Sequence, residues 1–251
     1  MGPKDEIPKY DDGSVDSTME RMIVSIDLPE NKMTGEIPQE VMALPYLTRL
    51  GLWSNEIEGS LPSQLGELKQ LSSLLLDDNS LKGYIPSQLG ELSELTDLSL
   101  GYNEEIGGRI PPELGNLSKL ERLSLSNMSL SGPIPAQLGQ LSNLEELQLD
   151  NNRLSRGLPN ELAKLSNLET LSLNGNELTG TIPDSWARTL TKLKKLEIQG
   201  NDMKFDIDDK LCALRDTNDE GSVGLLEALV ADCQGDEPKV TCSCCTSCFG
   251  K

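Results

Sequence analysis

The chain has 251 residues and a formal net charge of −19, from 22 Lys and Arg against 41 Asp and Glu. This excess of acid argues against a nucleic-acid binder, because neutralising phosphates requires a surplus of basic side chains. The chain has no histidine, which excludes catalytic triads and dyads with a histidine base and zinc sites that contain histidine. We therefore expect a protein that is not an enzyme, with no catalytic residues, no metal and no cofactor.

Residues 1–21 are acidic and interrupted by Pro and Gly, and they contain no apolar run of signal-peptide length. No stretch of 18 or more apolar residues follows, so we expect no membrane segment in this chain. We interpret residues 1–21 as a flexible N-terminal segment that precedes the folded part of the protein.

A pattern Leu-x-x-Leu-x-Leu-x-x-Asn recurs eight times over residues 22–207. The units are 24 residues long, and two intervals lengthen to 25 where the phrases NEEIGG and SWARTL each add one residue. The Leu-x-Leu alternation predicts a short strand whose leucines point inward, and stacked strands of this kind form one parallel sheet. A buried asparagine after each strand could pair backbone groups at the turn, so we predict a structural ladder: Asn31, Asn55, Asn79, Asn103, Asn152, Asn176 and Asn201, with Met128 in one unit.

A second phrase, Leu-x-Gly-x-Ile-Pro, follows the asparagine, as in SLKGYIPSQLGEL and SLSGPIPAQLGQL. Glycine permits a tight bend and proline fixes φ, so each repeat should close into one coil. The two phrases together resemble the plant-type leucine-rich repeat of receptor-like kinase and receptor-like protein ectodomains and of secreted algal proteins. The resemblance implies an α/β fold, a right-handed solenoid of about eight repeats, curved into an arc with its parallel sheet on the concave face.

Residues 208–251 are predicted to form a C-terminal cap. The coil series should stop after Ile207, and the segment SVGLLEALVADC, residues 222–233, has the apolar spacing of an amphipathic helix that could seal the last coil. All six cysteines lie in this part of the chain: Cys212, Cys233, Cys242, Cys244, Cys245 and Cys248.

The dense thiols of the tail could ligate zinc, but an even number of cysteines and the adjacent pair at 244–245 also suit disulfides. The resemblance favours disulfides that tie the cap to the tail, although the pairing cannot be read from the sequence. Disulfides imply an oxidising compartment, so we expect an extracellular or cell-surface protein. Two sequons, at Asn116 and Asn127, are compatible with a secretory route and equally with chance in a Ser- and Asn-rich repeat.

In the resembled family, outward positions of the concave strands bind partners. Trp53 and Leu75 are large apolar residues at such positions in adjacent repeats, and Trp, Tyr and Arg anchor interfaces most often. We therefore predict a partner-binding patch, although single exposed aromatic residues are also ordinary surface. Its members are Arg49, Trp53, Leu75, Asp77, Asp97 and Tyr102.

The favoured function is a protein- or peptide-binding module in recognition or signalling, either an ectodomain or a secreted adaptor. We expect a monomer or a ligand-dependent dimer. An alternative is an inhibitor of a secreted cell-wall-degrading enzyme, as some members of the resembled family are. Ice binding is a minor alternative, because it calls for a flat, regular column of Thr or Asn, whereas the outward strand positions here are mixed.

Overall fold

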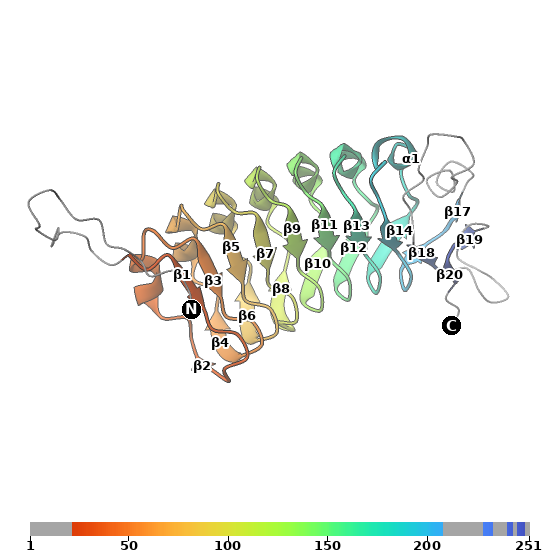
Figure 1. Ribbon diagram of the computed structural model, residues 1–251. Coiled ribbons are helices and arrows are strands. Elements are labelled where there is room, and N and C mark those ends of the chain that lie inside the picture. Colours follow the sequence, from red (N-terminus) through yellow and green to blue (C-terminus); the bar gives the residue numbers. More distant parts are fainter. Residues whose placement is uncertain (1–21, 208–227, 233–239, 243–244, 249–251) are drawn as a thin grey trace, which may run out of the picture.

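The computed structural model describes residues 22–207, 228–232, 240–242 and 245–248. Successive coils lie side by side in sequence order, each contributing a strand to a long sheet, a strand to a second sheet and a short helix (Figure 1). The leucine-rich solenoid predicted from the repeat is therefore confirmed over residues 22–207.

The long sheet has ten parallel strands among the described residues, and its order follows the chain. Neighbouring strands pair in register, so that Leu50, Leu74 and Leu98 lie beside one another. The strands are β1 (Ser25–Asp27), β3 (Arg49–Gly51), β5 (Ser73–Leu75), β7 (Asp97–Ser99), β9 (Arg122–Ser124), β11 (Glu146–Gln148), β13 (Thr170–Ser172), β15 (Lys195–Glu197), β18 (Ala228–Ala231) and β20 (Ser247–Cys248).

The Leu-x-Gly phrase of each coil forms the second sheet, whose eight described strands are also parallel. These strands are β2 (Thr34–Gly35), β4 (Glu56–Ser60), β6 (Ser80–Tyr84), β8 (Glu105–Gly108), β10 (Ser129–Gly132), β12 (Arg153–Arg156), β14 (Glu177–Gly180) and β16 (Asp202–Met203). A further parallel pair joins β17 (Phe205–Ile207) to β19 (Val240–Cys242).

Each coil then returns through a short helix, which begins directly after the proline of the Ile/Leu-Pro phrase in the first six cases and three residues after Pro183 in the seventh. Six are 3₁₀ helices, whereas the seventh described helix is a single α-helical turn. They are η1 (Gln39–Ala43), η2 (Ser63–Glu67), η3 (Ser87–Glu91), η4 (Pro112–Asn116), η5 (Ala136–Gln140), η6 (Asn160–Lys164) and α1 (Trp186–Thr189).

The core is a continuous column of leucines between the two sheets and the helices. Leu74 and Leu76 in one coil, and Leu98 and Leu100 in the next, are buried, whereas Leu75 between the first two is only half-buried. A single coil cannot enclose these side chains, so each coil depends on its neighbours for stability.

The asparagine side chains connect the coils at the turn after each long-sheet strand. Asn103 is fully buried, and its Oδ1 accepts a hydrogen bond at 3.0 Å from the backbone N–H of Leu81 in the preceding coil. Its Nδ2 donates to the carbonyl of Leu76 in that coil and to the carbonyls of Leu100 and Gly101 in its own. Equivalent bonds recur at the other buried or half-buried asparagines of the ladder. Asn31, in the first described coil, is exposed, and its side-chain amide donates to the carbonyl of Pro29.

Met128 replaces the asparagine in the coil after the first one-residue insertion. An asparagine there would accept the N–H of Ile106, but Ile106 instead donates to the carbonyl of Asn103 at 3.0 Å, inside the lengthened turn. Because the one-residue insertion lets the N–H of Ile106 bond to a carbonyl of its own turn, position 128 does not need an asparagine amide as acceptor. The Met128 side chain is instead buried in the core.

The glycine in the Leu-Gly phrase lets adjacent helices approach closely. A Cβ atom at Gly115 would overlap the carbonyl oxygen of Gln137 in the next coil, and Gly66, Gly90 and Gly139 meet the same backbone obstacle. The sixth coil has Ala163 at this position, where the next element is α1 rather than a 3₁₀ helix. Glycine therefore permits the close approach of η2, η3, η4 and η5 to the helix of the next coil, whereas η1 has Met42 at the same position.

We expect Gly115→Ala to lower the free energy of unfolding by about 2 kcal/mol, because the backbone of the next coil must move to accommodate the methyl group. Ala163→Gly is the matched control and should cost no more than about 1 kcal/mol, from backbone entropy alone. Urea denaturation followed by circular dichroism measures both. Equal midpoints for Gly115→Ala and the unaltered protein would contradict this close packing.

Two expectations for the C-terminal cap are wrong. Residues 228–231, predicted as part of a helix, form strand β18, which pairs in parallel with β15. The coil series does not stop at Ile207, because β18 and β20 extend the long sheet by two strands. Leu229 of β18 is fully buried beside Leu196, so this segment continues the leucine column rather than covering it.

The remaining expectations for the ends of the chain fall mainly outside the described residues. These are the N-terminal segment 1–21, residues 222–227 and 233 of the predicted helix, and Cys212, Cys233 and Cys244. Cys245, whose side chain lies within the described part of the chain, is disulfide-bonded. The pairing of the other cysteines stays a prediction.

Candidate functional site

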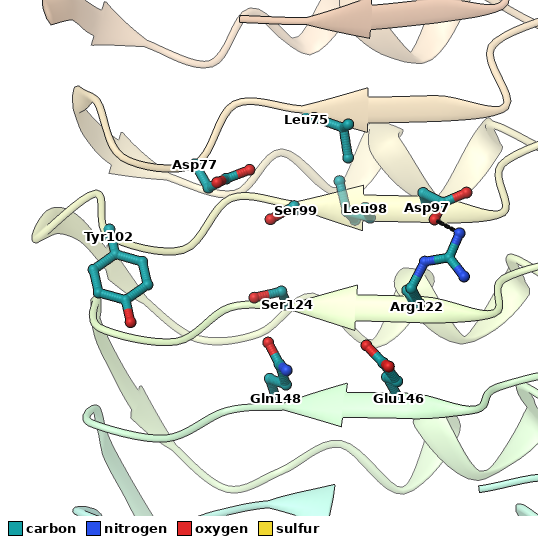
Figure 2. A pocket seen from close by; sticks show the side chains of 10 residues that line it. All are labelled: Leu75, Asp77, Asp97, Leu98, Ser99, Tyr102, Arg122, Ser124, Glu146 and Gln148. Atoms are coloured by element: carbon teal, nitrogen blue, oxygen red, sulfur yellow. Dashed lines mark ion pairs between the residues drawn. The ribbon is translucent and has the colours of Figure 1, made fainter. Parts of the chain in front are cut away.

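A hollow of about 310 Å³ lies on the outer face of the long sheet, across strands β5, β7, β9 and β11 (Figure 2). The hollow exists because outward positions of its two central strands, β7 and β9, carry the short side chains of Ser99 and Ser124. Larger side chains stand around these serines. The lining residues are Leu75, Asp77, Asp97, Leu98, Ser99, Tyr102, Arg122, Ser124, Glu146 and Gln148.

Four of the six residues predicted to bind a partner line this hollow: Leu75, Asp77, Asp97 and Tyr102. The other two, Arg49 and Trp53, lie toward the N-terminal end of the sheet and interact with each other. The Arg49 guanidinium is 5.8 Å from the centre of the Trp53 ring, 3.4 Å from Asp27 and 3.0 Å from the Ser73 hydroxyl. The predicted patch is therefore two separate groups.

Tyr102 forms one end of the hollow in an unfavourable backbone conformation. Its φ is +57°, in the left-handed region, and its side chain is 57% exposed. The residue before the ladder position is left-handed in every coil, but elsewhere it is polar or glycine: Glu30, Ser54, Asp78, Asn127, Asn151, Gly175 and Gly200. A bulky aromatic side chain is disfavoured there by about 1 kcal/mol or more, so Tyr102 is not explained by the stability of the turn.

The charges of the hollow are only partly paired. Arg122 forms an ion pair with Asp97, whose other carboxylate oxygen accepts a 2.7 Å hydrogen bond from the Thr96 hydroxyl (Figure 2). No cation among the described residues lies within ion-pair distance of Asp77 or Glu146. Three carboxylates against one guanidinium leave the lining with a net charge of −2.

The prediction missed five lining residues on the surface, namely Ser99, Arg122, Ser124, Glu146 and Gln148. Strand alternation predicts that these side chains point outward. Whether they line a hollow depends on where neighbouring coils have small side chains at the same position of the repeat. The side chains of Ser99 and Ser124 are shorter than those of the residues around them. Their shortness is the feature that creates the hollow.

No group of three or more His, Cys, Asp or Glu side chains within the described ranges could hold a metal ion. Among the same residues, no helix has the length and apolar character needed to cross a membrane. The lining of the hollow offers the apolar surfaces of Leu75 and Tyr102, the polar side chains of Ser99, Ser124 and Gln148, and the carboxylates of Asp77 and Glu146.

Two family models match the chain, one described as "Leucine rich repeat" over residues 143–203 and another as "Leucine Rich Repeat" over residues 119–141. No curated protein sequence matches it. Among solved structures, the ectodomain of the Arabidopsis thaliana membrane receptor kinase GASSHO1/SCHENGEN3, in complex with CASPARIAN STRIP INTEGRITY FACTOR 2, is 41% identical with a TM-score of 0.73. That match covers 76% of this chain and 23% of the receptor chain.

The Arabidopsis receptor kinase HAESA, in complex with the peptide hormone IDA and the co-receptor SERK1, is 32% identical with a TM-score of 0.71. The match covers 74% of this chain and 31% of HAESA, so this chain spans about a quarter to a third of these two receptor structures. A plant ice-binding protein is 28% identical with a TM-score of 0.67, over 76% of this chain and 69% of that protein. Together with the coil geometry, these matches show that the chain is a leucine-rich-repeat protein of the plant type, similar to receptor kinase ectodomains.

Proposed function

We propose that this protein binds a peptide, or an extended segment of a protein partner, in the hollow of the long sheet. The ligand would place an apolar side chain between Leu75 and Tyr102 and a lysine or arginine beside Asp77 or Glu146. The proposal places the protein outside the cell, as a recognition ectodomain or a secreted adaptor.

Tyr102 carries this proposal. A solvent-exposed tyrosine in a left-handed turn costs stability, and the other coils avoid this cost with smaller or more polar residues. Strained backbone is typical of ligand-binding positions, where a fixed side-chain direction outweighs its cost in folding. The tyrosine stands at the edge of the hollow, where its ring can cover a ligand on the serine floor (Figure 2).

Charge supports a basic ligand. Asp97 and Arg122 neutralise one another, whereas Asp77 and Glu146 remain available to a cation. A net charge of −19 over the whole chain also favours the approach of basic partners over acidic ones. The two receptors named above were solved with CASPARIAN STRIP INTEGRITY FACTOR 2 and with the peptide hormone IDA, and the second of these supports peptide recognition as the class of function.

Ice binding receives less support despite the similarity to a plant ice-binding protein. The central residues of the strands, such as Leu50 and Leu74, point inward and are buried, and the outward positions on either side of them carry a mixture of acids, bases, serines and glycine. The outward positions of the described long-sheet strands contain no repeated column of Thr or Asn. The mixed charges of the hollow instead suit a ligand with its own charge pattern.

The test is selection of binders from a library of random 12-residue peptides displayed on phage, using the full oxidised chain. We expect the selected peptides to be enriched in Lys or Arg next to an apolar residue. Tyr102→Asn should weaken their binding about 30-fold, which corresponds to about 2 kcal/mol for an anchoring aromatic side chain. The same change should leave stability equal or slightly higher, because asparagine accepts the left-handed turn better than tyrosine does.

Tyr84→Ala is the matched control, because Tyr84 is also an exposed tyrosine, at 73%, but lies on the second sheet. It should leave peptide affinity unchanged when measured by isothermal titration calorimetry. Leu75→Ala should weaken binding like Tyr102→Asn does. Peptides that bind Tyr102→Asn and Leu75→Ala with full affinity, or no enrichment of basic residues, would contradict the proposed site.

A further inference from the structure

The two sequons of the chain lie in different structural settings. Asn116 is the last residue of helix η4 and is exposed, as is Ser118, whereas Leu117 between them is buried in the core. Neither the Asn116 amide nor the Ser118 hydroxyl has a hydrogen-bond partner among the described residues. The corresponding residues of η2, η3, η5 and η6 are also polar, namely Glu67, Glu91, Gln140 and Lys164, whereas η1 ends at Ala43.

The second sequon, Asn127-Met128-Ser129, is less exposed than the first. Asn127 is half-buried with a φ of +54°, and its N–H donates to the carbonyl of Asp150 at 2.9 Å. Met128 is buried, and the Ser129 hydroxyl donates a 2.8 Å hydrogen bond to the carbonyl of Glu104. The hydroxyl on which a sequon depends is therefore occupied at this site and accessible at Ser118.

We propose that Asn116 carries an N-linked glycan and that Asn127 does not. The inference rests on the extracellular location included in the proposed function. In the reaction, the Asn116 Nδ2 forms a bond to the anomeric carbon of an oligosaccharide that is linked to a lipid diphosphate. The lipid diphosphate leaves from that carbon, and the amide loses one proton.

The position of Asn116 determines what the glycan would cover. Leu114 and Leu117 point from η4 into the same core as Leu123 and Leu125 of the neighbouring coil. An outward residue of η4 therefore faces the opposite side of the coil from an outward residue of the long sheet. A glycan on Asn116 would shield the helical face and leave the hollow open to its ligand.

The experiment is secretion of the full chain from plant cells behind a heterologous leader peptide, which brings the protein to the glycosylation machinery whatever its native location. Enzymatic release of N-glycans in isotopically labelled water converts each occupied asparagine into a labelled aspartate, which peptide mass spectrometry locates. We expect the label at Asn116 in most molecules and none at Asn127.

Asn116→Gln and Ser118→Ala should each yield an unglycosylated chain, whereas Ser118→Thr, which keeps the hydroxyl, should retain the glycan. Asn127→Gln should leave the glycan in place. An unmodified Asn116, or label at Asn127, would overturn the assignment. Peptide binding by Asn116→Gln should equal that of the unaltered chain, so a failure of the glycan assignment is measured separately from a failure of the binding proposal.

Discussion

Replacing Asn103 by alanine is expected to lower the free energy of unfolding by about 3 kcal/mol. The side chain is fully buried and makes four hydrogen bonds to backbone groups of two coils. Its loss leaves the N–H of Leu81 and the carbonyl of Leu100 without this partner in the core, and each unpaired buried group costs about 1–3 kcal/mol. The expected effect is therefore larger than the loss of one surface hydrogen bond.

Asn31→Ala is the matched control. Asn31 occupies the same position of the repeat but is exposed, and its amide donates only to Pro29 O. This variant should remain within about 0.5 kcal/mol of the unaltered protein. Because solenoids can unfold in stages, the urea transitions should be followed by both circular dichroism and tryptophan fluorescence. If Asn103→Ala and Asn31→Ala had the same midpoint, the buried amide would not connect the coils.

The coil architecture could be predicted because one period determines it. A 24-residue repeat with inward leucines has only one way to bury each coil, namely against the next, so local pattern and global fold agree. The irregularities of the repeat could also be recognised in part from the sequence. The insertion before Ile106 and the methionine at 128 appear as separate irregularities in the sequence, but only the structure shows that the first compensates for the second.

The candidate site was predicted less completely, for a physical reason. Strand alternation predicts which strand residues point outward, such as Leu75 and Asp97, and these two line the hollow together with Asp77 and Tyr102. The depth of the hollow depends instead on the size of the side chains in neighbouring coils, because Ser99 and Ser124 are shorter than the residues around them. The left-handed turn at Tyr102 becomes visible only when the same position is compared in all coils.

The prediction of a helix over residues 222–233 was wrong at residues 228–231, because pairing with strand β15 outweighs the helical spacing of the apolar residues. Strand β15 would otherwise end the sheet with an unpaired edge, and residues Ala228–Ala231 supply the partner for that edge. The alternating burial of Ala228, Leu229, Val230 and Ala231 suits a strand as well as the apolar spacing suits a helix. Tertiary pairing therefore overrides the helical pattern.

Trp186→Ala is expected to lower the free energy of unfolding by about 4 kcal/mol, because it removes the largest fully buried side chain among the described residues. Trp186 occupies the position filled by Leu65, Leu89, Leu114, Leu138 and Leu162 in other coils. The extra residue of SWARTL widens this turn, so that Leu190 donates to the carbonyl of Trp186 four residues back, whereas Leu165 donates to Leu162 three residues back. The wider α-helical turn makes room for an indole where the 3₁₀ helices have leucine or, in η1, Val41.

Trp186→Leu distinguishes this explanation from a general need for an apolar residue. Leucine restores the residue of the other coils but leaves part of the indole volume empty, because the inserted residue still widens the turn, so we expect a cost of about 2 kcal/mol. Deleting Thr189 in the Trp186→Leu background should recover part of that loss by restoring the 24-residue spacing. Urea denaturation monitored by circular dichroism compares the three variants without relying on the fluorescence of the removed tryptophan. A Trp186→Leu variant as stable as the unaltered protein would show that the inserted residue does not enlarge the core, and the coupling between insertion and indole would then be wrong.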